Sequence, residues 1–213
     1  MKSFYPIMID IENKPCVVIG GGYTSYKKVS SLLLYRGKVT VISPKLCVEL
    51  YELHENGVVK WVPREYKLGD LEDTYLVYGA TNNREVNKEI FIEAKTKAVL
   101  VNIVDEIDNC EFIVPAVVKQ GDLTIAISTN GKSPMLARKI KEDLKKVYGT
   151  KYEKVLEILG NLRQEIINEF PESSTRYSIF KELVYSNLLY DIIEEREEII
   201  MRELKVVLQR HKK

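Results

Sequence analysis

The sequence predicts an α/β fold, in which a Rossmann-type parallel sheet is followed by a region containing a β-hairpin and by a helical C-terminal domain. Three observations support this prediction. Apolar strand-like segments alternate with helix-like segments up to Asp105, which is typical of a parallel sheet with helical crossovers. A run of three glycines follows one of the predicted strands. Beyond Ser133 almost every segment has the composition of a helix.

The alternating part of the chain is expected to hold most of the strands. Short apolar runs bounded by Gly, Pro or Asp suit strands that are buried on both faces of a sheet. We predict strands at residues 4–9, 16–19, 38–42, 58–62, 75–78 and 98–104, and helices after the glycine run, at residues 46–55 and at residues 84–95.

The second half of the chain no longer alternates between predicted strands and helices. The Gly121-Asp122 pair predicts the turn of a β-hairpin formed by residues 112–118 and 123–128. Ser133 and Pro134 are typical of an N-cap and a first helical position, so a helix is expected to begin there. Helix breaks are predicted at Gly149, Gly160 and residues 170–174, and the predicted domains are residues 1–113, 114–148 and 149–213.

Composition argues against several classes of function. With 32 Lys and Arg against 31 Asp and Glu, the charge gives no case for binding nucleic acid or an anionic membrane. Three cysteines without C-x-x-C spacing fit a reducing compartment, and two histidines cannot supply a His-rich metal site. No signal peptide is recognisable, and no run reaches the ~20 apolar residues of a membrane span. We therefore expect a cytoplasmic protein without a bound metal.

The glycine run Gly20-Gly21-Gly22 matches the first two glycines of G-x-G-x-x-G. Gly20 permits a tight turn, and Gly22 lets the backbone approach a pyrophosphate, whose charge is favoured at the N-terminus of the next helix. Ser25 stands at the third position and is small enough for close packing of the helix on the strand. The pattern predicts a dinucleotide site, and a glycine turn of another α/β protein is the alternative.

The end of the following strand leaves the choice of dinucleotide open. Residues 43–45, Ser-Pro-Lys, contain no carboxylate for the ribose hydroxyls. The Ser43 hydroxyl is able to bond the ribose, whereas Lys45 would tolerate a 2′-phosphate. The residues themselves therefore do not decide between NAD and NADP.

Polar residues follow two later strands of the predicted sheet. Thr81, Asn82 and Asn83 either contact a cofactor or cap the next helix. Asn102 bonds either a nicotinamide or the backbone. Asp105 ends a strand at the edge where open α/β sheets bind ligands, so it is either a base in catalysis or the cap of a turn.

A polar loop at residues 128–133 precedes a predicted helix. Backbone N–H groups at such a helix start bind anions, and Lys132 and Arg138 would add positive charge. A helix cap with a solvated lysine is the plain alternative.

Six ordered blocks resemble the precorrin-2 dehydrogenase family, which also forms the dehydrogenase and ferrochelatase module of siroheme synthases. The blocks are residues 5–7 (YPI), 18–22 (VIGGG) with Lys27-Lys28, 79–83 (GATNN), 101–105 (VNIVD), 112–116 (FIVPA) and 127–138 (ISTNGKSPMLAR). The sequence departs from the family at Ser25, Lys27, Asn82-Asn83 and Asn130, where the family has Ala, Arg, two Asp and Gly. Asn130 is therefore expected in the left-handed conformation, which Asn tolerates better than most residues.

The resemblance implies oxidation of precorrin-2 to sirohydrochlorin by a homodimer, with NAD⁺ accepting a hydride and Asp105 taking part in catalysis. It also implies that residues 114–148 form a dimerisation region. The implied cofactor-binding residues are Gly20, Gly21, Gly22, Tyr23, Thr24, Ser25, Ser43, Pro44, Lys45, Ala80, Thr81, Asn82, Asn102 and Val104. The implied substrate-binding residues, which would face a polycarboxylate, are Ser128, Thr129, Asn130, Gly131, Lys132, Ser133 and Arg138.

Two other functions are alternatives. Some members of the family also insert Fe²⁺ into the product, so the first alternative is a bifunctional dehydrogenase and ferrochelatase (a lyase). An NAD-sensing regulatory module is the other, although it would not need Asp105 together with residues 128–138.

Aromatic side chains beyond residue 114 independently favour a homodimer, because aromatic residues are enriched at interfaces. They are Tyr148, Tyr152, Phe180, Tyr185 and Tyr190.

Overall fold

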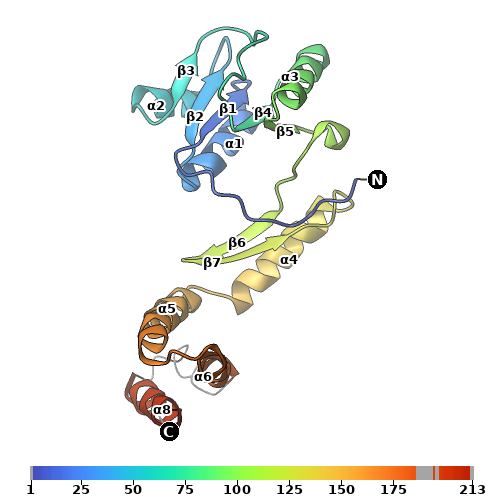
Figure 1. Ribbon diagram of the computed structural model, residues 1–213. Coiled ribbons are helices and arrows are strands. Elements are labelled where there is room, and N and C mark those ends of the chain that lie inside the picture. The colour runs from blue at the N-terminus through green and yellow to red at the C-terminus, as the bar shows by residue number, and fades with distance from the viewer. Residues whose placement is uncertain (1, 186–193, 195–196, 212–213) are drawn as a thin grey trace. The chain divides into compact units, whose positions relative to one another are not determined.

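The computed structural model describes residues 2–185, 194 and 197–211. The chain divides into two compact units, Met1–Val114 and Pro115–Lys213, and each unit buries apolar side chains of its own (Figure 1). Within the described ranges, no helix is both long and apolar enough to cross a membrane.

The first unit is built on a five-stranded parallel sheet in the order β3-β2-β1-β4-β5. Its strands are β1 (Pro15–Ile19), β2 (Lys38–Ile42), β3 (Lys60–Val62), β4 (Leu76–Gly79) and β5 (Leu100–Ile103). Ile19 at the end of β1 pairs with Ile42 on one side and with Gly79 on the other. The strand order therefore reverses at β1, the place where open α/β sheets bind ligands. The predicted Rossmann-type sheet is confirmed.

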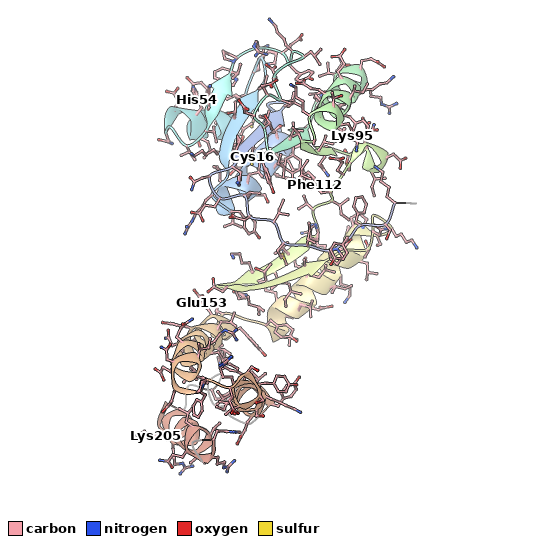
Figure 2. The ribbon with its side chains drawn as sticks, viewed as in Figure 1. Cys16, His54, Lys95, Phe112, Glu153 and Lys205 are labelled. Carbon is pink, nitrogen blue, oxygen red and sulfur yellow. The ribbon has the colours of Figure 1, made fainter. Side chains whose placement is uncertain are left out.

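Helices cover both faces of this sheet. Helices α1 and α2 lie on one face and α3 on the other (Figure 1). Their bounds are Tyr23–Leu34, Val48–Glu55 and Arg84–Thr96. Cys16 of β1, which is labelled in Figure 2, and Val18 pack with Val29 of α1. Ile19 packs with Ile90 of α3. Because both faces are buried, the strands are continuous apolar runs with no polar alternation.

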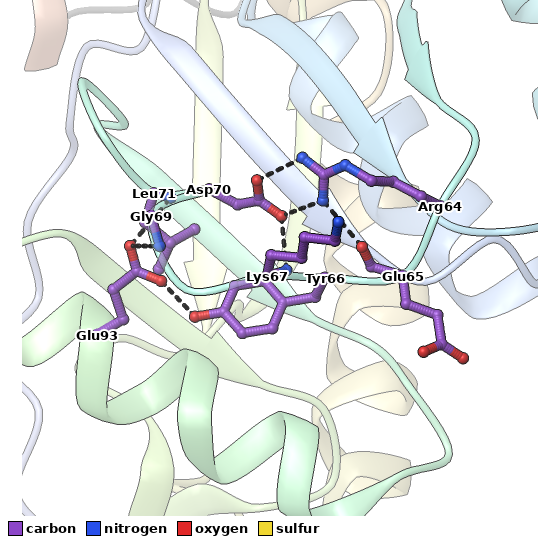
Figure 3. A network of polar contacts seen from close by, with 8 residues as sticks. All are labelled: Arg64, Glu65, Tyr66, Lys67, Gly69, Asp70, Leu71 and Glu93. Atoms are coloured by element: carbon purple, nitrogen blue, oxygen red, sulfur yellow. Dashed lines mark hydrogen bonds and ion pairs between the residues drawn. The ribbon is translucent and has the colours of Figure 1, made fainter.

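The crossover from β3 to β4 is a loop, residues 63–75, where the other crossovers contain a helix. Tyr66 and Leu71 of this loop pack into the core beside α3. The buried carboxylate of Glu93 on α3 accepts hydrogen bonds from the Tyr66 hydroxyl and from the amides of Gly69 (3.0 Å) and Leu71 (3.2 Å) (Figure 3). A buried carboxylate needs such donors, so Glu93 ties the loop to the helix.

The predicted strand at residues 4–9 is wrong. These residues form no strand in the described structure, and Tyr5, Ile7 and Met8 are largely exposed. The segment is instead tied down at Lys2, whose ammonium donates to the carbonyls of Asp108 (2.6 Å) and Cys110 (2.9 Å). An apolar extended segment becomes a strand only where a sheet edge offers it backbone partners.

The second unit begins with the antiparallel hairpin of β6 (Ala116–Gln120) and β7 (Leu123–Ile127), joined by the predicted Gly121-Asp122 turn. The hairpin begins four residues later than predicted. Four described helices follow: α4 (Pro134–Val147), α5 (Lys151–Glu169), α6 (Ser173–Tyr185) and α8 (Glu197–Arg210). The Ser133 hydroxyl accepts from the amide of Leu136 (3.2 Å), which confirms the predicted N-cap of α4.

The predicted helix break at Gly160 is also wrong, since Gly160 lies inside α5. Glycine costs a helix interior about 1 kcal/mol relative to alanine. Val155, Leu162 and Ile166 of the same helix are buried in the core of the second unit. Packing of this apolar face outweighs the local preference of one exposed glycine. The prediction that residues 186–193 are helical lies outside the described residues.

Candidate functional site

Most of the predicted cofactor-binding residues lie at one edge of the sheet. Residues 20–25 follow β1, residues 43–45 follow β2, residues 80–82 follow β4 and residues 104–105 follow β5. Because the strands are parallel, these loops all leave the sheet at its carboxyl edge, on both sides of the point where the strand order reverses. The sheet topology thus gathers residues that are up to 85 positions apart in the chain.

Two of the three glycines are required by the packing of neighbouring loops. Gly20 has φ +120°, and a Cβ placed on it would lie 2.3 Å from the carbonyl oxygen of Ala80. A Cβ on Gly21 would lie 1.9 Å from the carbonyl oxygen of Lys45. The turn after β1 is therefore pressed between the loops that follow β4 and β2, and only glycine fits at these two positions.

Gly22 differs from its two neighbours. Its backbone is extended, it is the N-cap residue of α1, and a Cβ on it would have no described atom within 4 Å. No side chain of the described residues caps α1, and the first turn, which includes the exposed Tyr23 and Thr24, contains no acidic residue. Backbone donors and the positive end of the helix dipole therefore face open space, which suits a phosphate group.

Ser25 lies in the first turn of α1 and is fully buried. Its hydroxyl has no hydrogen-bond partner among the described residues. It also lies 3.0 Å from the position that a Cβ on Gly20 would take, so a larger residue would push helix and strand apart. A small residue is needed at this third position of the glycine motif, as the sequence predicts. A buried hydroxyl without a partner beside the glycine turn is consistent with a polar ligand at this place.

The loop after β2 is held in a defined shape. Ser43 is buried, and its hydroxyl donates to the carbonyl oxygen of Lys45 (2.8 Å). The indole N–H of Trp61 donates to the carbonyl oxygen of Ser43 (2.9 Å). The hydroxyl proton of Ser43 is thus used inside the loop, and only its lone pairs are available to a ribose. Pro44 and the side chain of Lys45 are exposed.

The loop after β4 caps the next helix. The Asn83 side chain accepts from the amides of Glu85 and Val86, which assigns the N-cap of α3 to Asn83 and not to Asn82. The Thr81 hydroxyl donates to the side-chain oxygen of the buried Asn87 (2.7 Å), and the Asn87 amide donates to the Thr81 carbonyl oxygen (3.2 Å). This exchange fixes the loop against the helix and leaves the side chain of Asn82 exposed.

The loop after β5 contains the predicted catalytic carboxylate. Asn102 is buried, and its side-chain amide donates a hydrogen bond to the backbone carbonyl oxygen of Phe112 (2.9 Å). The amide of Val104 donates to Gly79 and continues the sheet for one residue beyond β5. Asp105 then turns the chain with φ +63°, a conformation that Asp adopts more readily than most residues, and its side chain is exposed.

Lys28 of α1 also lies at this site. The sequence analysis named it only within a segment that resembles the family and predicted no role for it. Its ammonium lies over the ring of Tyr78 on β4, 5.2 Å from the ring centroid, and the side chain is half-buried. Burial lowers the pKa of Lys28, while the negative charge of Asp105 acts in the opposite direction. The structure therefore places a cation within electrostatic reach of Asp105, which no local sequence pattern could indicate.

The predicted substrate-binding loop belongs to the second unit. The Ser128 hydroxyl accepts from the amide of Asn130 (3.0 Å), and the Thr129 hydroxyl accepts from the amide of Ser133 (3.1 Å). Asn130 has φ +52° and Gly131 has φ +79°. The left-handed conformation expected for Asn130 is confirmed.

The two basic residues of this region are exposed. Lys132 extends from the loop, and Arg138 forms an ion pair with Glu142 on the surface of α4 (3.3 Å). Exposed pairs of this kind contribute little stability, so Arg138 can exchange its partner for another anion at small cost.

The cysteines and histidines form no recognisable metal centre. In the ranges that the structure describes, no three His, Cys, Asp or Glu side chains are grouped so that they could hold a metal ion. All three cysteines are free. Burial raises the pKa of the Cys16 thiol to about 11, which keeps it protonated and unreactive.

The fold and the site define a class of protein, the NAD(P)-binding Rossmann proteins. A family model described as "Putative NAD(P)-binding" matches residues 7–116, which is 110 of the 213 residues. A second family model, described as "Sirohaem biosynthesis protein central", matches residues 120–146. The first model covers more than half of the chain, so the chain belongs to this NAD(P)-binding family.

Individual relatives agree with this assignment. The chain is 35% identical over 188 residues to a siroheme synthase of Vesicomyosocius okutanii subsp. Calyptogena okutanii, covering 88% of this chain and 40% of the relative. It is 32% identical over 203 residues to a siroheme synthase of Buchnera aphidicola subsp. Acyrthosiphon pisum, covering 95% and 43%. The chain thus spans about two fifths of these relatives.

A solved structure matches the chain over nearly its whole length. It is titled "SirC, precorrin-2 dehydrogenase", and it aligns with a TM-score of 0.78 and 26% identity, covering 95% of this chain and 99% of that chain. The resemblance stated from the sequence blocks is confirmed.

Proposed function

We propose that the protein oxidises precorrin-2 to sirohydrochlorin, with NAD⁺ as the hydride acceptor. The observation that carries the proposal is the arrangement at the carboxyl edge of the sheet: the open N-terminus of α1 at Gly22 and the carboxylate of Asp105 lie at the same edge. The match to a precorrin-2 dehydrogenase over 95% of the chain supports the choice of substrate.

The residues of the first unit fit a dinucleotide. In this proposal the backbone at Gly22, Tyr23 and Thr24 binds the pyrophosphate, and the Ser25 hydroxyl finds its missing partner near the phosphates. Residues 43–45 lie along the adenosine ribose. Ala80, Thr81, Asn82, Asn102 and Val104 border the nicotinamide. The cofactor supplies the hydride-accepting ring, and the protein supplies its orientation.

Asp105 is proposed as the base of the reaction. Oxidation removes two hydrogens from precorrin-2: a hydride goes to the nicotinamide, and a proton goes to a base. The exposed carboxylate of Asp105 is able to accept that proton, and Lys28 provides a positive charge close to it.

Binding of the substrate is assigned to the second unit as well. The polar loop before α4 consists of Ser128, Thr129, Asn130, Gly131, Lys132 and Ser133, and the amides of Asn130, Lys132 and Ser133 are bonded inside it. The exposed ammonium of Lys132 and the exposed guanidinium of Arg138 supply the positive charge. These groups suit the carboxylates of a tetrapyrrole. We keep the domain limits at residues 1–113, 114–148 and 149–213, with the middle domain as the dimerisation region.

A homodimer in the cytoplasm is part of the proposal. The hairpin β6-β7 has only two strands and packs against α4, and many of its side chains remain half-buried. Met135, Leu136 and Val147 of α4 are exposed, as is Tyr185. Tyr190, which was also expected at the interface, lies outside the described residues.

The decisive experiment is anaerobic incubation with precorrin-2 and NAD⁺, following NADH absorbance and the visible spectrum of the macrocycle. Equimolar formation of NADH and sirohydrochlorin is the expected result. Binding of NAD⁺ without any turnover would favour the regulatory module. Adding Fe²⁺ to the reaction tests the bifunctional alternative, in which Fe²⁺ is a second substrate and siroheme the product.

A further inference from the structure

We infer that the dinucleotide site accepts NADP⁺ as well as NAD⁺, because Lys45 pairs with the 2′-phosphate of the adenosine ribose. The inference rests on the proposed dinucleotide site and adds to it which dinucleotides the site admits. It is carried by the geometry of the loop between β2 and α2.

The backbone of Lys45 is held against the glycine turn. The amide of Cys47 donates to the carbonyl oxygen of Gly21 (2.7 Å), and a Cβ on Gly21 would lie 1.9 Å from the carbonyl oxygen of Lys45. The same Lys45 carbonyl accepts the Ser43 hydroxyl (2.8 Å). The loop that follows the second strand of a Rossmann fold borders the adenosine ribose, so Lys45 begins from a fixed point beside that ribose.

The loop lacks the group that selects NAD⁺. An Asp or Glu at the end of the second strand normally bonds the ribose 2′-hydroxyl, and its charge repels a 2′-phosphate. No acidic residue occurs from Ser43 to Val48. The next one, Glu49, lies in the first turn of α2. The repulsion that would exclude NADP⁺ is therefore missing from this loop.

Lys45 is also an available cation at this end of the sheet. Arg64, which follows the neighbouring strand β3, is held by the carboxylate of Asp70 through two hydrogen bonds of 2.7 and 2.6 Å. Lys45 forms no ion pair with any residue that the structure describes, and its side chain is exposed. Its ammonium can approach a phosphate without first giving up a partner.

The test compares the affinities of the full chain for NAD⁺ and NADP⁺ by calorimetric titration. We expect the two dissociation constants to agree within about tenfold, and Lys45→Glu to weaken NADP⁺ by about tenfold to a hundredfold, the range of a hydrogen bond to a charged group. The same variant should weaken NAD⁺ by a smaller factor than NADP⁺ or not weaken it, because a Glu at this place is able to accept a hydrogen bond from the 2′-hydroxyl of NAD⁺ but repels the 2′-phosphate of NADP⁺. Lys45→Gln should give a smaller loss of NADP⁺ affinity, since it removes the attraction without adding repulsion.

Lys38→Glu is the matched control. It makes the same charge change on an exposed lysine at the opposite end of β2, and it should leave both affinities unchanged. NADP⁺ binding should also weaken more steeply with added salt than NAD⁺ binding.

Two results would overturn the inference. One is a parent protein that binds NAD⁺ and rejects NADP⁺. The other is a Lys45→Glu variant that loses both dinucleotides equally or neither of them. Failure of the parent to bind either dinucleotide would instead contradict the proposed function, so the two failures are distinguishable.

Discussion

At the scale of single residues, three consecutive glycines serve different purposes. Gly20 and Gly21 are needed by the protein itself, because a side chain at either position would collide with the backbone of Ala80 or Lys45. Gly22 has open space around it and is dispensable for packing. A side chain at Gly22 would obstruct only a ligand that approaches the N-terminus of α1. Substitutions of Gly20 and Gly21 should therefore affect stability, whereas substitutions of Gly22 should affect binding.

We predict that Gly22→Val abolishes most NAD⁺ binding, raising the dissociation constant by about tenfold or more, because the side chain stands where a phosphate must approach. The free energy of unfolding should fall by no more than about 1 kcal/mol, the cost of a poorer N-cap. Titration and thermal melting measure the two quantities. Gly20→Ala is the contrasting variant: its φ of +120° and the 2.3 Å contact with Ala80 should make it clearly less stable than Gly22→Val. If Gly22→Val binds as tightly as the parent while folded, the dinucleotide site lies elsewhere.

Asp105→Asn tests the proposed base. Asn has the same shape and tolerates φ +63° at least as well, so the fold should persist. Loss of a general base typically lowers the rate by about 10²–10⁴-fold, and we expect that loss in kcat for precorrin-2 oxidation. The dissociation constant for NAD⁺, measured in parallel, should change little. Oxidation at near the parent rate would show that Asp105 is structural.

At the scale of elements, the loop of residues 63–75 does the work of a crossover helix. Glu93 fastens its middle to α3, and a bidentate pair between Arg64 and Asp70 closes it on itself (Figure 3). Asp70 also accepts from the amide of Lys67 (2.8 Å). The hydrogen bond from Arg64 is the main cause that lowers the pKa of Asp70 from its ordinary value of 3.8. Folding therefore stabilises the ionised form of the Asp70 carboxyl group.

This lowered pKa predicts a pH dependence of stability. The contribution of Asp70 is fully present at pH values well above 3.8 and is lost as the pH falls through the lower pKa of the folded state. Asp70→Asn should therefore cost about 1 kcal/mol at neutral pH, as for a partly exposed ion pair, and the difference from the parent should shrink under acid. Urea unfolding at several pH values measures it. Glu65→Gln, in the same loop with an exposed side chain, is the control and should cost almost nothing. An Asp70→Asn cost that stays constant down to strongly acidic pH would contradict this account.

At the scale of the whole molecule, two units with separate cores share one proposed reaction. The first unit carries the glycine turn and Asp105, and the second carries the polar loop before α4. The two-stranded sheet β6-β7 packs against α4, yet most of its side chains are only half-buried, and Leu136 and Val147 of α4 are exposed. These features support a partner chain that covers it.

We expect light scattering at micromolar concentration to give twice the mass of the 24.6 kDa chain. Leu136→Glu, which places a charge on the exposed apolar side of α4, should shift the protein toward the monomer if this helix lies in the interface. Lys139→Glu is a control on the same helix, where the lysine already forms a surface pair with Asp143. A parent protein that is monomeric would contradict the proposed homodimer.

The sequence by itself determined the parallel sheet, the hairpin turn and the Ser133 cap of α4, because periodicity, apolar runs and turn residues act over a few positions. It also marked the glycine turn and Asp105, since glycine and the end of a strand are local signals. The helix break at Gly160 and the strand at residues 4–9 were predicted wrongly because neither depends on local sequence. Packing of the helix decides the first, and the lack of a strand to pair with decides the second. Only the tertiary structure decided that the charge of Asp105 acts on Lys28, that Asn83 and not Asn82 caps α3, and that Lys45 is held against Gly21. These contacts join loops that lie far apart in the sequence. The order of the strands in the sheet brings the loops to one edge, and no pattern within a single segment encodes that order.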